Sequence, residues 1–459
     1  MTLMEKIMDE SIKNVYFLGI GGIGMSALAR YFKAGGYRVA GYDRTPSALT
    51  EKMRQEEGMI IGYRDDEADI PEEFRDVQTT LVVYTPAVPS DNCQMTCFRN
   101  IGFELHKRAE VLGMISRKGR AVCVAGTHGK TTVSTMTAFL LHRSHVGCCA
   151  FLGGISVNFG SNLLLGDSPY VVIEADEFDR SFLHLTPELA VITSMDEDHL
   201  DIYGDKARLA EAFEAFAQRV VPGGRLFLKQ GLELRQAHVT ASYGVETDAE
   251  CRAENLRIEQ GRYVFDYHGR DVFIRDLVLG IPGKLNVENA VAAITLALEA
   301  GVCPEEIREA LPEFRGVVRR FHIHARGERR IYIDDYAHHP REIEATLRSV
   351  REMWKDMPVT VVFQPHLFSR TQDFYRDFAR SLSLADRVIL LDIYPARELP
   401  IPGVTSEIIL KELTVPGTIK SKEELLPCLK AEVADGILIT MGAGDIDRLV
   451  GDITDMWKE

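Results

Sequence analysis

The chain has 459 residues, more than one ordinary hydrophobic core holds, so we expect two or three domains. A net charge of −15 argues against a general nucleic-acid or anionic-membrane surface, although amides, Lys and Mg²⁺ can still hold an anionic substrate locally. No apolar run reaches the ~18 residues of a membrane helix, and the opening MTLMEKIMDESIKN lacks the core of a signal peptide. We therefore expect a soluble cytoplasmic monomer or homodimer that neither binds nucleic acid nor inserts into a membrane.

The first part of the chain alternates short apolar strands with helices. Strands are predicted at 15–20, 38–43 and 80–84, and a helix at 25–33 follows a glycine-rich turn. This alternation is typical of a parallel sheet covered on both faces. We assign residues 1–110 to a Rossmann-like domain.

Two further α/β domains are predicted after residue 110. In residues 111–318 we predict helices at 130–141 and 287–298, short antiparallel strands within 225–280, and strands at 121–125, 170–174 and 189–193. In residues 319–459 we predict strands at 331–335, 359–364, 387–393 and 436–441. The predicted fold class is α/β with three domains: a Rossmann-like domain, a phosphate-loop ATPase-like domain with an added small antiparallel sheet, and a second Rossmann-like domain.

The first glycine cluster, residues 19–24, fits the pattern G-x-G-x-x-G between a strand and a helix. Its glycines Gly19, Gly21, Gly22 and Gly24 let the backbone approach a diphosphate, which the helix N-terminus favours. Asp43 ends the next strand at the distance expected for a ribose contact. A plain strand-to-helix turn is the alternative. The motif reports a diphosphate near a helix start, so a dinucleotide and a UDP-sugar both satisfy it.

The second cluster lies between a strand and a helix and comprises Gly126, Thr127, His128, Gly129, Lys130, Thr131 and Thr132. The strict phosphate-loop pattern fails, because it requires a glycine where this chain has Val124. The physical parts are nevertheless present: Lys130 for the β- and γ-phosphates of ATP and a hydroxyl for Mg²⁺. We interpret residues 126–132 as the ATP site.

Acidic residues follow two predicted strands of the 111–318 domain that are consecutive in the chain. Glu174 ends a buried strand, and we predict it to be a Mg²⁺ ligand, because buried acids need a partner or a metal. Asp176 and Glu177 come next, and helix capping is their alternative interpretation. His199 stands among acids after the following strand, which favours a metal or phosphate contact over a purely structural histidine.

The predicted domain of residues 319–459 also carries polar clusters where its strands end. These are Asp334 to Pro340, Phe363 to His366 with Arg370, and Gly442 to Asp445. Ligands of parallel sheets bind at the carboxyl ends of the strands, so these positions indicate a further binding region. His339 before Pro340 has the alternative role of starting a helix.

With these motifs in order, the chain resembles the Mur ligases of peptidoglycan synthesis. The resemblance runs through nearly the whole chain in the stretches GIGGIGMSALA, AGTHGKTT, GGISVNFGSN, EADEFDRSFL, DEDHLDIYG, GKLNVENAVAA, GVVRRF, DDYAHHP, FQPH with SRT, and MGAGDI. Within the family it is closest to the members that join L-alanine to UDP-N-acetylmuramate.

The resemblance implies a reaction and three domains, one for UDP, one for ATP and a closing C-terminal domain that brings the amino acid. ATP and Mg²⁺ activate the lactyl carboxylate of UDP-N-acetylmuramate as an acyl phosphate, and the amine of L-alanine displaces phosphate. Lys130, Glu174 and His199 would be the catalytic residues, with Thr131, Glu174 and His199 as metal ligands.

The resemblance also implies binding residues in all three domains. Beyond residues 126–132, ATP would contact Asn286, Asn289, Arg320 and Asp335. The UDP-sugar would contact Gly19, Gly21, Gly22, Gly24, Met25, Asp43, Thr85, Pro86, Gly153, Gly154 and Asn162. The incoming alanine would contact Tyr336, His338 and Arg370.

The chain departs from the family pattern in three places, the first of which spans two residues. Lys284 and Leu285 precede Asn286 where many members have His-Asn, which makes that match a shifted one. Leu367 stands where many members have an arginine, which leaves Arg370 for the alanine carboxylate. Glu214 stands where sister ligases carry a carbamylated lysine, so that modification is not expected.

Three alternatives remain open from the sequence. A ligase that adds a preformed tripeptide to UDP-N-acetylmuramate shares most motifs, although the stretch 179–185 favours the alanine enzyme. A dehydrogenase that uses NAD follows from Gly19 to Asp43 alone and leaves Lys130 and Glu174 without a role. A non-catalytic nucleotide-binding module is the third.

Overall fold

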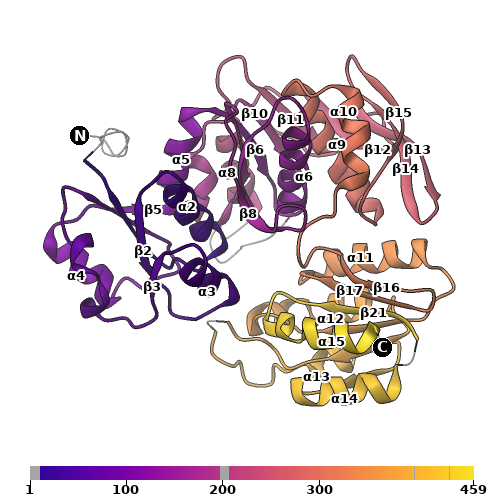
Figure 1. The fold of residues 1–459 in the computed structure, drawn as a ribbon. Coiled ribbons are helices and arrows are strands. Elements are labelled where there is room, and N and C mark those ends of the chain that lie inside the picture. Colours follow the sequence, from indigo (N-terminus) through magenta and orange to yellow (C-terminus); the bar gives the residue numbers. More distant parts are fainter. Residues whose placement is uncertain (1–10, 197–205, 397, 434, 459) are drawn as a thin grey trace. The chain divides into compact units, whose positions relative to one another are not determined.

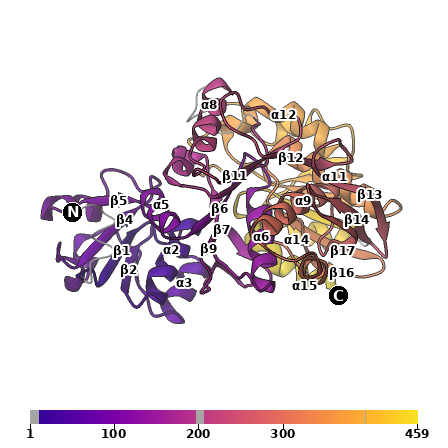
Figure 2. The ribbon, with the colours of Figure 1, turned by 90° about the horizontal axis from the view of Figure 1, so that it is seen from above.

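The computed structural model describes residues 11–196, 206–396, 398–433 and 435–458. The chain divides into two compact units, and the colours of Figures 1 and 2 follow the chain from indigo at the N-terminus to yellow at the C-terminus. The first unit runs to Asn255 and takes in Phe265–Leu277 and Glu288–Phe314. The second unit holds Leu256–Val264, Val278–Val287 and the chain from Arg315 onward.

The first sheet has five strands within the described residues, in the order β3-β2-β1-β4-β5, and all of them pair parallel. Its strands are β1 (Asn14–Leu18), β2 (Arg38–Tyr42), β3 (Ile60–Gly62), β4 (Thr80–Tyr84) and β5 (Leu105–Lys107). The helices and 3₁₀ turns between them are α2 (Ile23–Ala34), α3 (Ala48–Gln55), η1 (Glu67–Asp69), η2 (Glu72–Phe74), α4 (Cys93–Ile101) and α5 (Arg108–Lys118). Its central strand β1 is buried along its whole length, as a strand covered on both faces must be.

Helix α2 connects this sheet to the next one within the first unit. Its apolar residues Met25, Leu28 and Phe32 are buried, and the helix contacts both β2 and the strands β7 (Cys149–Ser156) and β8 (Ser161–Leu164). Arg30 at its centre holds Glu57 through a bidentate ion pair with a shortest distance of 2.6 Å. The first and second sheets therefore share one hydrophobic core.

The second sheet has ten strands over the described ranges, in the order β15-β14-β13-β12-β11-β10-β6-β9-β7-β8. Strands new to this sheet are β6 (Arg120–Ala125), β9 (Tyr170–Ala175), β10 (Leu189–Ile192), β11 (Arg225–Lys229), β12 (Ala241–Val245), β13 (Cys251–Glu259), β14 (Arg262–His268) and β15 (Phe273–Val278). Its helices and 3₁₀ turns are α6 (Lys130–Arg143), η3 (Phe178–His184), α8 (Lys206–Ala217), α9 (Lys284–Glu299), α10 (Pro304–Ala310) and η4 (Leu311–Glu313). Helix α6 is buried from Thr131 to Leu141 and lies next to α9 in both views (Figures 1 and 2).

The strands within 225–280 differ from the predicted small antiparallel sheet. Strands β11 and β12 pair parallel with their neighbours, and β12 pairs parallel with the start of β13. Only Gln260 and Gly261 separate β13 from β14, so this pair is an antiparallel hairpin. The ladder continues without a break from β6, so these strands extend the central sheet rather than forming one of their own.

The third sheet, in the second unit, has six strands in the part of the chain that the structure describes, in the order β16-β17-β21-β18-β19-β20. The strands are β16 (His322–Arg326), β17 (Arg330–Asp335), β18 (Val359–Phe363), β19 (Arg387–Leu390), β20 (Gly417–Ile419) and β21 (Gly436–Met441). The helices are α11 (Pro340–Met353), α12 (Phe368–Leu382), α13 (Glu407–Leu410), α14 (Lys422–Glu432) and α15 (Val450–Lys458), with the 3₁₀ turn η5 (Asp445–Leu449). Only β16 pairs antiparallel among the registers given for this sheet.

Three α/β sheets in chain order confirm the predicted three-domain α/β architecture. The boundaries at 110/111 and 318/319 stay a prediction. Among the described residues, no helix has both the length and the apolar character needed to cross a membrane.

Candidate active site

The phosphate loop, residues 126–132, joins the end of β6 to the start of α6. Gly126 and Gly129 have φ values of +136° and +82°, a region that side-chain-bearing residues rarely adopt. A Cβ on Gly126 would lie 2.2 Å from the Thr193 hydroxyl. Both glycines are therefore required by the backbone path of the loop. The helix that follows points its free N–H groups into the loop, which suits a phosphate.

The end of β10 fastens this loop from the neighbouring strand. The His128 N–H donates to Ser194 Oγ at 2.6 Å, and the Thr127 and Ser194 hydroxyls are 3.0 Å apart. The Thr193 hydroxyl donates to the His128 carbonyl. The sequence interpretation did not single out Thr193 and Ser194. Their position directly after a buried strand next to the loop strand was the available signal.

Lys130 is the first residue of α6, and its ammonium is held inside the site. It donates to Gly126 O at 2.6 Å and to the two Glu177 oxygens at 2.7 and 3.0 Å. The side chain of Lys130 is 13% exposed and that of Glu177 is 0% exposed. Burial alone would lower the pKa of Lys130, but Glu177, followed by Asp176 and Glu174, outweighs burial, so the pKa is raised. Lys130 is therefore a fixed positive charge at the mouth of the loop.

The acids after β9 have distinct roles in the structure. Asp176 Oδ1 accepts the Phe178 N–H at 3.1 Å and so caps the turn that begins η3. Glu177 does not cap this turn, because its carboxylate faces inward to Lys130. The capping alternative is therefore correct for Asp176 and wrong for Glu177.

Thr131 and Glu174, which the sequence predicts to be Mg²⁺ ligands, contact each other. The Thr131 hydroxyl donates to Glu174 Oε1 at 3.0 Å, and the Gly153 N–H donates to Oε2 at 3.0 Å. A Cβ on Gly153 would lie 2.2 Å from Glu174 Oε1, so only glycine leaves room for this carboxylate. A hydroxyl and a carboxylate are the hard oxygen ligands that Mg²⁺ prefers, so this pair fits the ion. The third predicted ligand, His199, lies outside the described residues.

The diphosphate loop, residues 19–24, repeats the strand–loop–helix design between β1 and α2. Gly19 has a φ of +86°, and a Cβ there would lie 2.5 Å from a carbon of Thr85. The Gly21 N–H donates to Asp43 Oδ2 at 2.7 Å, and the Thr45 N–H donates to Oδ1 at 3.2 Å. Asp43 therefore closes the loop itself, and its predicted ribose contact would use its remaining lone pairs.

Arg108, the first residue of α5, is a cation that the sequence interpretation missed. Its Nη1 lies 2.4 Å from where a Cβ on Gly24 would be, so it packs against the start of α2. Its guanidinium is 3.8 Å from Asp176, and the side chain is 20% exposed. No local motif gives a signal for Arg108, because it reaches the diphosphate loop from a different strand-helix unit.

Other predicted UDP-sugar residues lie around the start of α2. Asn162 is fully buried, and its amide donates to Ile23 O at 2.5 Å and to Ser26 Oγ at 3.0 Å. Its Oδ1 accepts from Arg30 at 2.9 Å, so Asn162 ties β8 to α2. Met25 is buried in the shared core. Gly22 is the residue before α2, Gly154 lies in β7, and Pro86 follows Thr85 just beyond β4.

The predicted adenine residues lie on the first turns of α9. The Asn289 side chain stands beside the phosphate loop, since a Cβ on Gly129 would lie 2.9 Å from its Oδ1. Asn286 donates its amide to Pro282 O at 2.5 Å. Both are buried, with 6% and 9% exposure, and the buried Thr132 belongs to the adjoining helix.

The second unit gathers its own polar cluster after β17. Asp335 accepts the Thr346 hydroxyl at 2.5 Å, and burial raises its pKa. The Arg320 guanidinium lies over the Tyr336 ring at 4.8 Å. Its neighbour Arg319 donates to Gly442 O at 2.7 Å and pairs with Asp447 at 3.2 Å. The structure thus brings the ends of β17 and β21 together, as the strand-end rule predicts.

The predicted alanine residues belong to the same cluster. The Tyr336 and His338 rings are 5.3 Å apart, and His338 and His366 are 6.2 Å apart. Burial, reinforced by Arg370 and Arg320, lowers the pKa of His338 to about 4 although Glu342 opposes it. Tyr394, stacked on His366 at 5.8 Å, belongs to the same group, and no sequence motif indicated it. Leu367 has a φ of +69°, an uncommon conformation for leucine.

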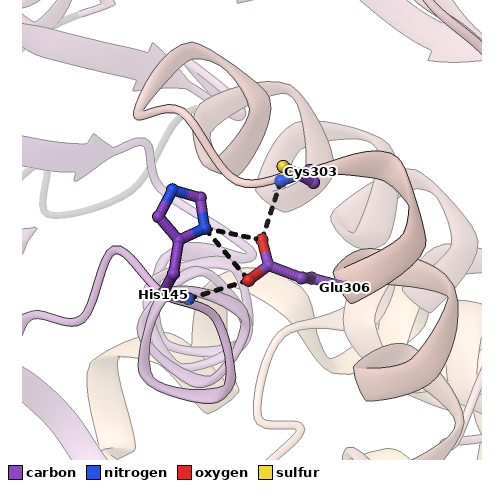
Figure 3. Close-up of side chains that lie close together, drawn as sticks. All are labelled: His145, Cys303 and Glu306. Carbon is purple, nitrogen blue, oxygen red and sulfur yellow. Dashed lines mark hydrogen bonds and ion pairs between the residues drawn. The ribbon is translucent and has the colours of Figure 1, made fainter.

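His145, Cys303 and Glu306 form a separate cluster of metal-ligand type in the first unit (Figure 3). Glu306 accepts the N–H groups of Cys303 and His145 at 2.9 and 2.8 Å and the His145 ring at 3.0 Å. These bonds make it the cap of α10, a helix N-terminus that repels a cation. We therefore assign the cluster to holding α10 against the end of α6, where the two helices also contact each other.

The comparisons with known proteins agree with this geometry. Residues 14–120 match the Mur ligase family, catalytic domain; residues 124–297 match the Mur ligase middle domain; and residues 319–444 match the Mur ligase, glutamate ligase domain. Together these matches span most of the chain.

Relatives of similar length carry one name. The UDP-N-acetylmuramate–L-alanine ligase of Phocaeicola vulgatus is 53% identical over 451 residues, covering 96% of this chain and 98% of that protein. That of Parabacteroides distasonis is 52% identical over 442 residues, covering 95% of each. The crystal structure of the UDP-N-acetylmuramate-alanine ligase of Thermotoga maritima superposes with a TM-score of 0.82 at 29% identity, covering 97% of this chain and 99% of that one. With a matched domain for each of the three sheets, the chain belongs to the Mur ligase family.

Proposed function

We propose that the protein joins L-alanine to the lactyl carboxylate of UDP-N-acetylmuramate at the expense of ATP, through an acyl phosphate. The observation that carries the proposal is the group of Lys130, Thr131 and Glu174 at the ends of two paired strands, β6 and β9. This group offers a fixed cation and hard oxygen ligands for a triphosphate. Relatives about half identical over nearly the full chain, all with the alanine ligase name, support the choice of substrates.

The first half-reaction transfers the γ-phosphoryl group of ATP to a carboxylate oxygen, and ADP leaves. Lys130 and the N–H groups at the start of α6 neutralise the charge on the phosphate oxygens. Asn289, whose Oδ1 lies beside Gly129, is a further proposed contact of the nucleotide. The sequence supplies Asn286, Arg320 and Asp335 as further proposed ATP contacts.

We propose that Thr131 and Glu174 hold Mg²⁺, with His199 as a further ligand. When bound, the ion would neutralise charge on the phosphate oxygens. Gly153 in β7 holds the Glu174 carboxylate by its N–H, so a strand proposed to contact the UDP-sugar also orients the proposed metal ligand.

The UDP part of the substrate binds at the diphosphate loop. The N-terminus of α2 and the guanidinium of Arg108 beside Gly24 supply positive charge there. Thr85 and Pro86 border the loop where β4 ends, and the buried Asn162 keeps the start of α2 in place. This part of the site is built on two sheets that share one core, so it is rigid.

In the second half-reaction the amine of L-alanine attacks the acyl carbon and phosphate leaves. Arg370 is the proposed partner of the alanine carboxylate, and Tyr336 and His338 lie in the same cluster. The lowered pKa keeps His338 neutral at pH 7, so its ring can accept a hydrogen bond from the neutral amine of L-alanine, and the proton that the nitrogen loses on forming the amide leaves with phosphate. Exclusion of water protects the acyl phosphate from hydrolysis.

Phosphate release from ATP tests this function, with UDP-N-acetylmuramate present and each amino donor added in turn. We expect release with L-alanine and none with the tripeptide L-alanyl-γ-D-glutamyl-meso-diaminopimelate. Release only with the tripeptide would establish the recycling ligase instead. Hydride transfer from a nicotinamide, read by absorbance, would restore the dehydrogenase, which the Lys130 and Glu174 geometry does not favour.

A further inference from the structure

Glu177 is a buried carboxylate in direct contact with the lysine of the phosphate loop. Its side chain is 0% exposed, and both of its oxygens lie within 3.0 Å of Lys130 Nζ. Gly126 O takes a further bond from the same ammonium at 2.6 Å. A lysine ammonium has three N–H donors, so these acceptors are enough to engage all of them. A phosphate oxygen can contact Lys130 only by replacing one of these acceptors.

The turn that carries Glu177 has an unusual backbone conformation. Asp179 and Arg180 both have positive φ, +53° and +55°, which is uncommon for residues with side chains. The Arg180 N–H donates to Glu177 O at 2.9 Å and closes the turn. Asp179 itself pairs with Lys107 at 3.0 Å, with both side chains more than a third exposed, so this pair is not part of the contact between Glu177 and Lys130. The backbone angles and the Arg180 N–H therefore define the turn that carries Glu177, and neither of them involves Lys130.

We propose that Glu177 is a positioning residue for phosphoryl transfer, which holds the Lys130 ammonium at the mouth of the loop and yields one N–H donor to the incoming triphosphate. The inference rests on the proposed ligase function and deepens it. Glu177 touches neither substrate nor metal in this role, because its carboxylate is enclosed by the protein and acts through Lys130.

Two consequences separate this role from a general structural one. Removal of the carboxylate frees the ammonium from a competitor, so a triphosphate binds more tightly. The same change leaves the ammonium without its orienting partner, so transfer becomes slower. Affinity and rate therefore change in opposite directions, and both changes require Lys130.

The test is a double-mutant cycle on the full chain with Glu177→Gln, Lys130→Ala and the double variant. Binding of a non-hydrolysable ATP analogue with Mg²⁺ is measured by calorimetry, and kcat and KM for ATP by phosphate release. Glu177→Asp keeps the charge and serves if Glu177→Gln does not fold. Asp179→Asn is the matched control, because it removes a carboxylate from the same turn that faces Lys107 instead.

For Glu177→Gln we expect analogue affinity to rise about threefold to tenfold and kcat to fall at least tenfold, with neither change in the Lys130→Ala background. For Glu177→Asp we expect kcat to fall with affinity within threefold of the parent, and for Asp179→Asn both within threefold. An unchanged kcat in Glu177→Gln, or equal effects with and without Lys130, would overturn the positioning role. A parent protein that binds the analogue but releases no phosphate with L-alanine would refute the proposed function alone, since the calorimetric half of the cycle still reports on Glu177.

Discussion

The diphosphate loop and the phosphate loop share a design and differ in where their positive charge comes from. Each connects a buried parallel strand to a helix through a glycine of positive φ, Gly19 in one and Gly126 with Gly129 in the other. The phosphate loop carries its own cation, Lys130, as the first residue of α6. The diphosphate loop has none and receives Arg108 from α5.

This difference follows from what each ligand must do. A diphosphate that only anchors a substrate needs a fixed complementary surface, which a rigid fork such as Arg108 provides. A triphosphate whose last group is transferred needs a cation held where the charge develops, and Glu177 and Gly126 O hold Lys130 in this way. The acidic residues of the two loops differ in the same way. Asp43 binds the loop backbone, whereas Glu177 and Glu174 bind the groups proposed to contact phosphate and metal.

Metal removal should separate the two loops most completely. With Mg²⁺ chelated, we expect phosphate release to fall to background, because Thr131 and Glu174 then lack the ion that completes the triphosphate site. Binding of UDP should change less than twofold, since the diphosphate loop relies on amides and Arg108. Calorimetry with UDP and the release assay measure both.

Restoration of activity by Mn²⁺, which accepts the same oxygen ligands, is the control for chelation. Loss of UDP affinity on chelation would show that both sites use the ion, and the difference between the two loops would then not hold.

Lys130→Ala should have the next largest effect. Removal of one preorganised cation or donor from a transition state slows reactions about 10²–10³-fold, and we expect kcat to fall in this range. UDP affinity should stay within twofold. Since the change also leaves Glu177 buried and unpaired, a thermal melt must accompany it. Lys130→Arg controls for charge alone, and we expect it to recover less than a tenth of the rate because Arg cannot use the same geometry.

Arg108→Ala should weaken the diphosphate loop and spare the phosphate loop. Loss of a hydrogen bond to a charged group changes the binding free energy by about 1.5–3 kcal/mol, which corresponds to roughly ten- to a hundredfold weaker UDP binding. KM for ATP should stay within threefold. The neighbouring cation Lys107 pairs with Asp179 at 3.0 Å and does not face Gly24, so Lys107→Ala is the matched control. Equal losses in both variants would indicate a general charge effect rather than a contact.

The phosphate loop could be predicted almost residue by residue, because its chemistry is contiguous. Gly126, Lys130 and Thr131 lie within one strand–loop–helix connection, and parallel strands end at one edge, which placed Glu174 beside them. The structure agrees, with Thr131 and Glu174 3.0 Å apart. The order of strands and helices was predictable for the same reason, since each is set by local periodicity.

Contacts between distant elements could not be predicted in this way. Arg108 reaches Gly24 from a different helix, and Asn162 reaches α2 from β8. Glu177 was given the capping alternative because a helix was expected after β9, whereas two residues of positive φ turn the chain there. The strands within 225–280 were expected to form a small antiparallel sheet, because a local pattern shows strand character but not which neighbour a strand pairs with.

Asp43→Asn should have the smallest effect on UDP affinity. This variant distinguishes a role of Asp43 in ribose binding from a role in holding the loop backbone. The asparagine oxygen can still accept the Gly21 N–H now bound at 2.7 Å, so the loop should keep its shape. What is lost is the charge, the longer 3.2 Å bond from the Thr45 N–H and the predicted contact to a ribose hydroxyl. The ribose contact is worth about 0.5–1.5 kcal/mol, or roughly a two- to tenfold loss of UDP affinity. Comparison of UDP with 2′-deoxy-UDP isolates that contact. The parent should prefer UDP, and the variant should bind the two equally. If the variant keeps the full preference, Asp43 serves the loop backbone alone, and ribose recognition belongs to another residue of the first sheet.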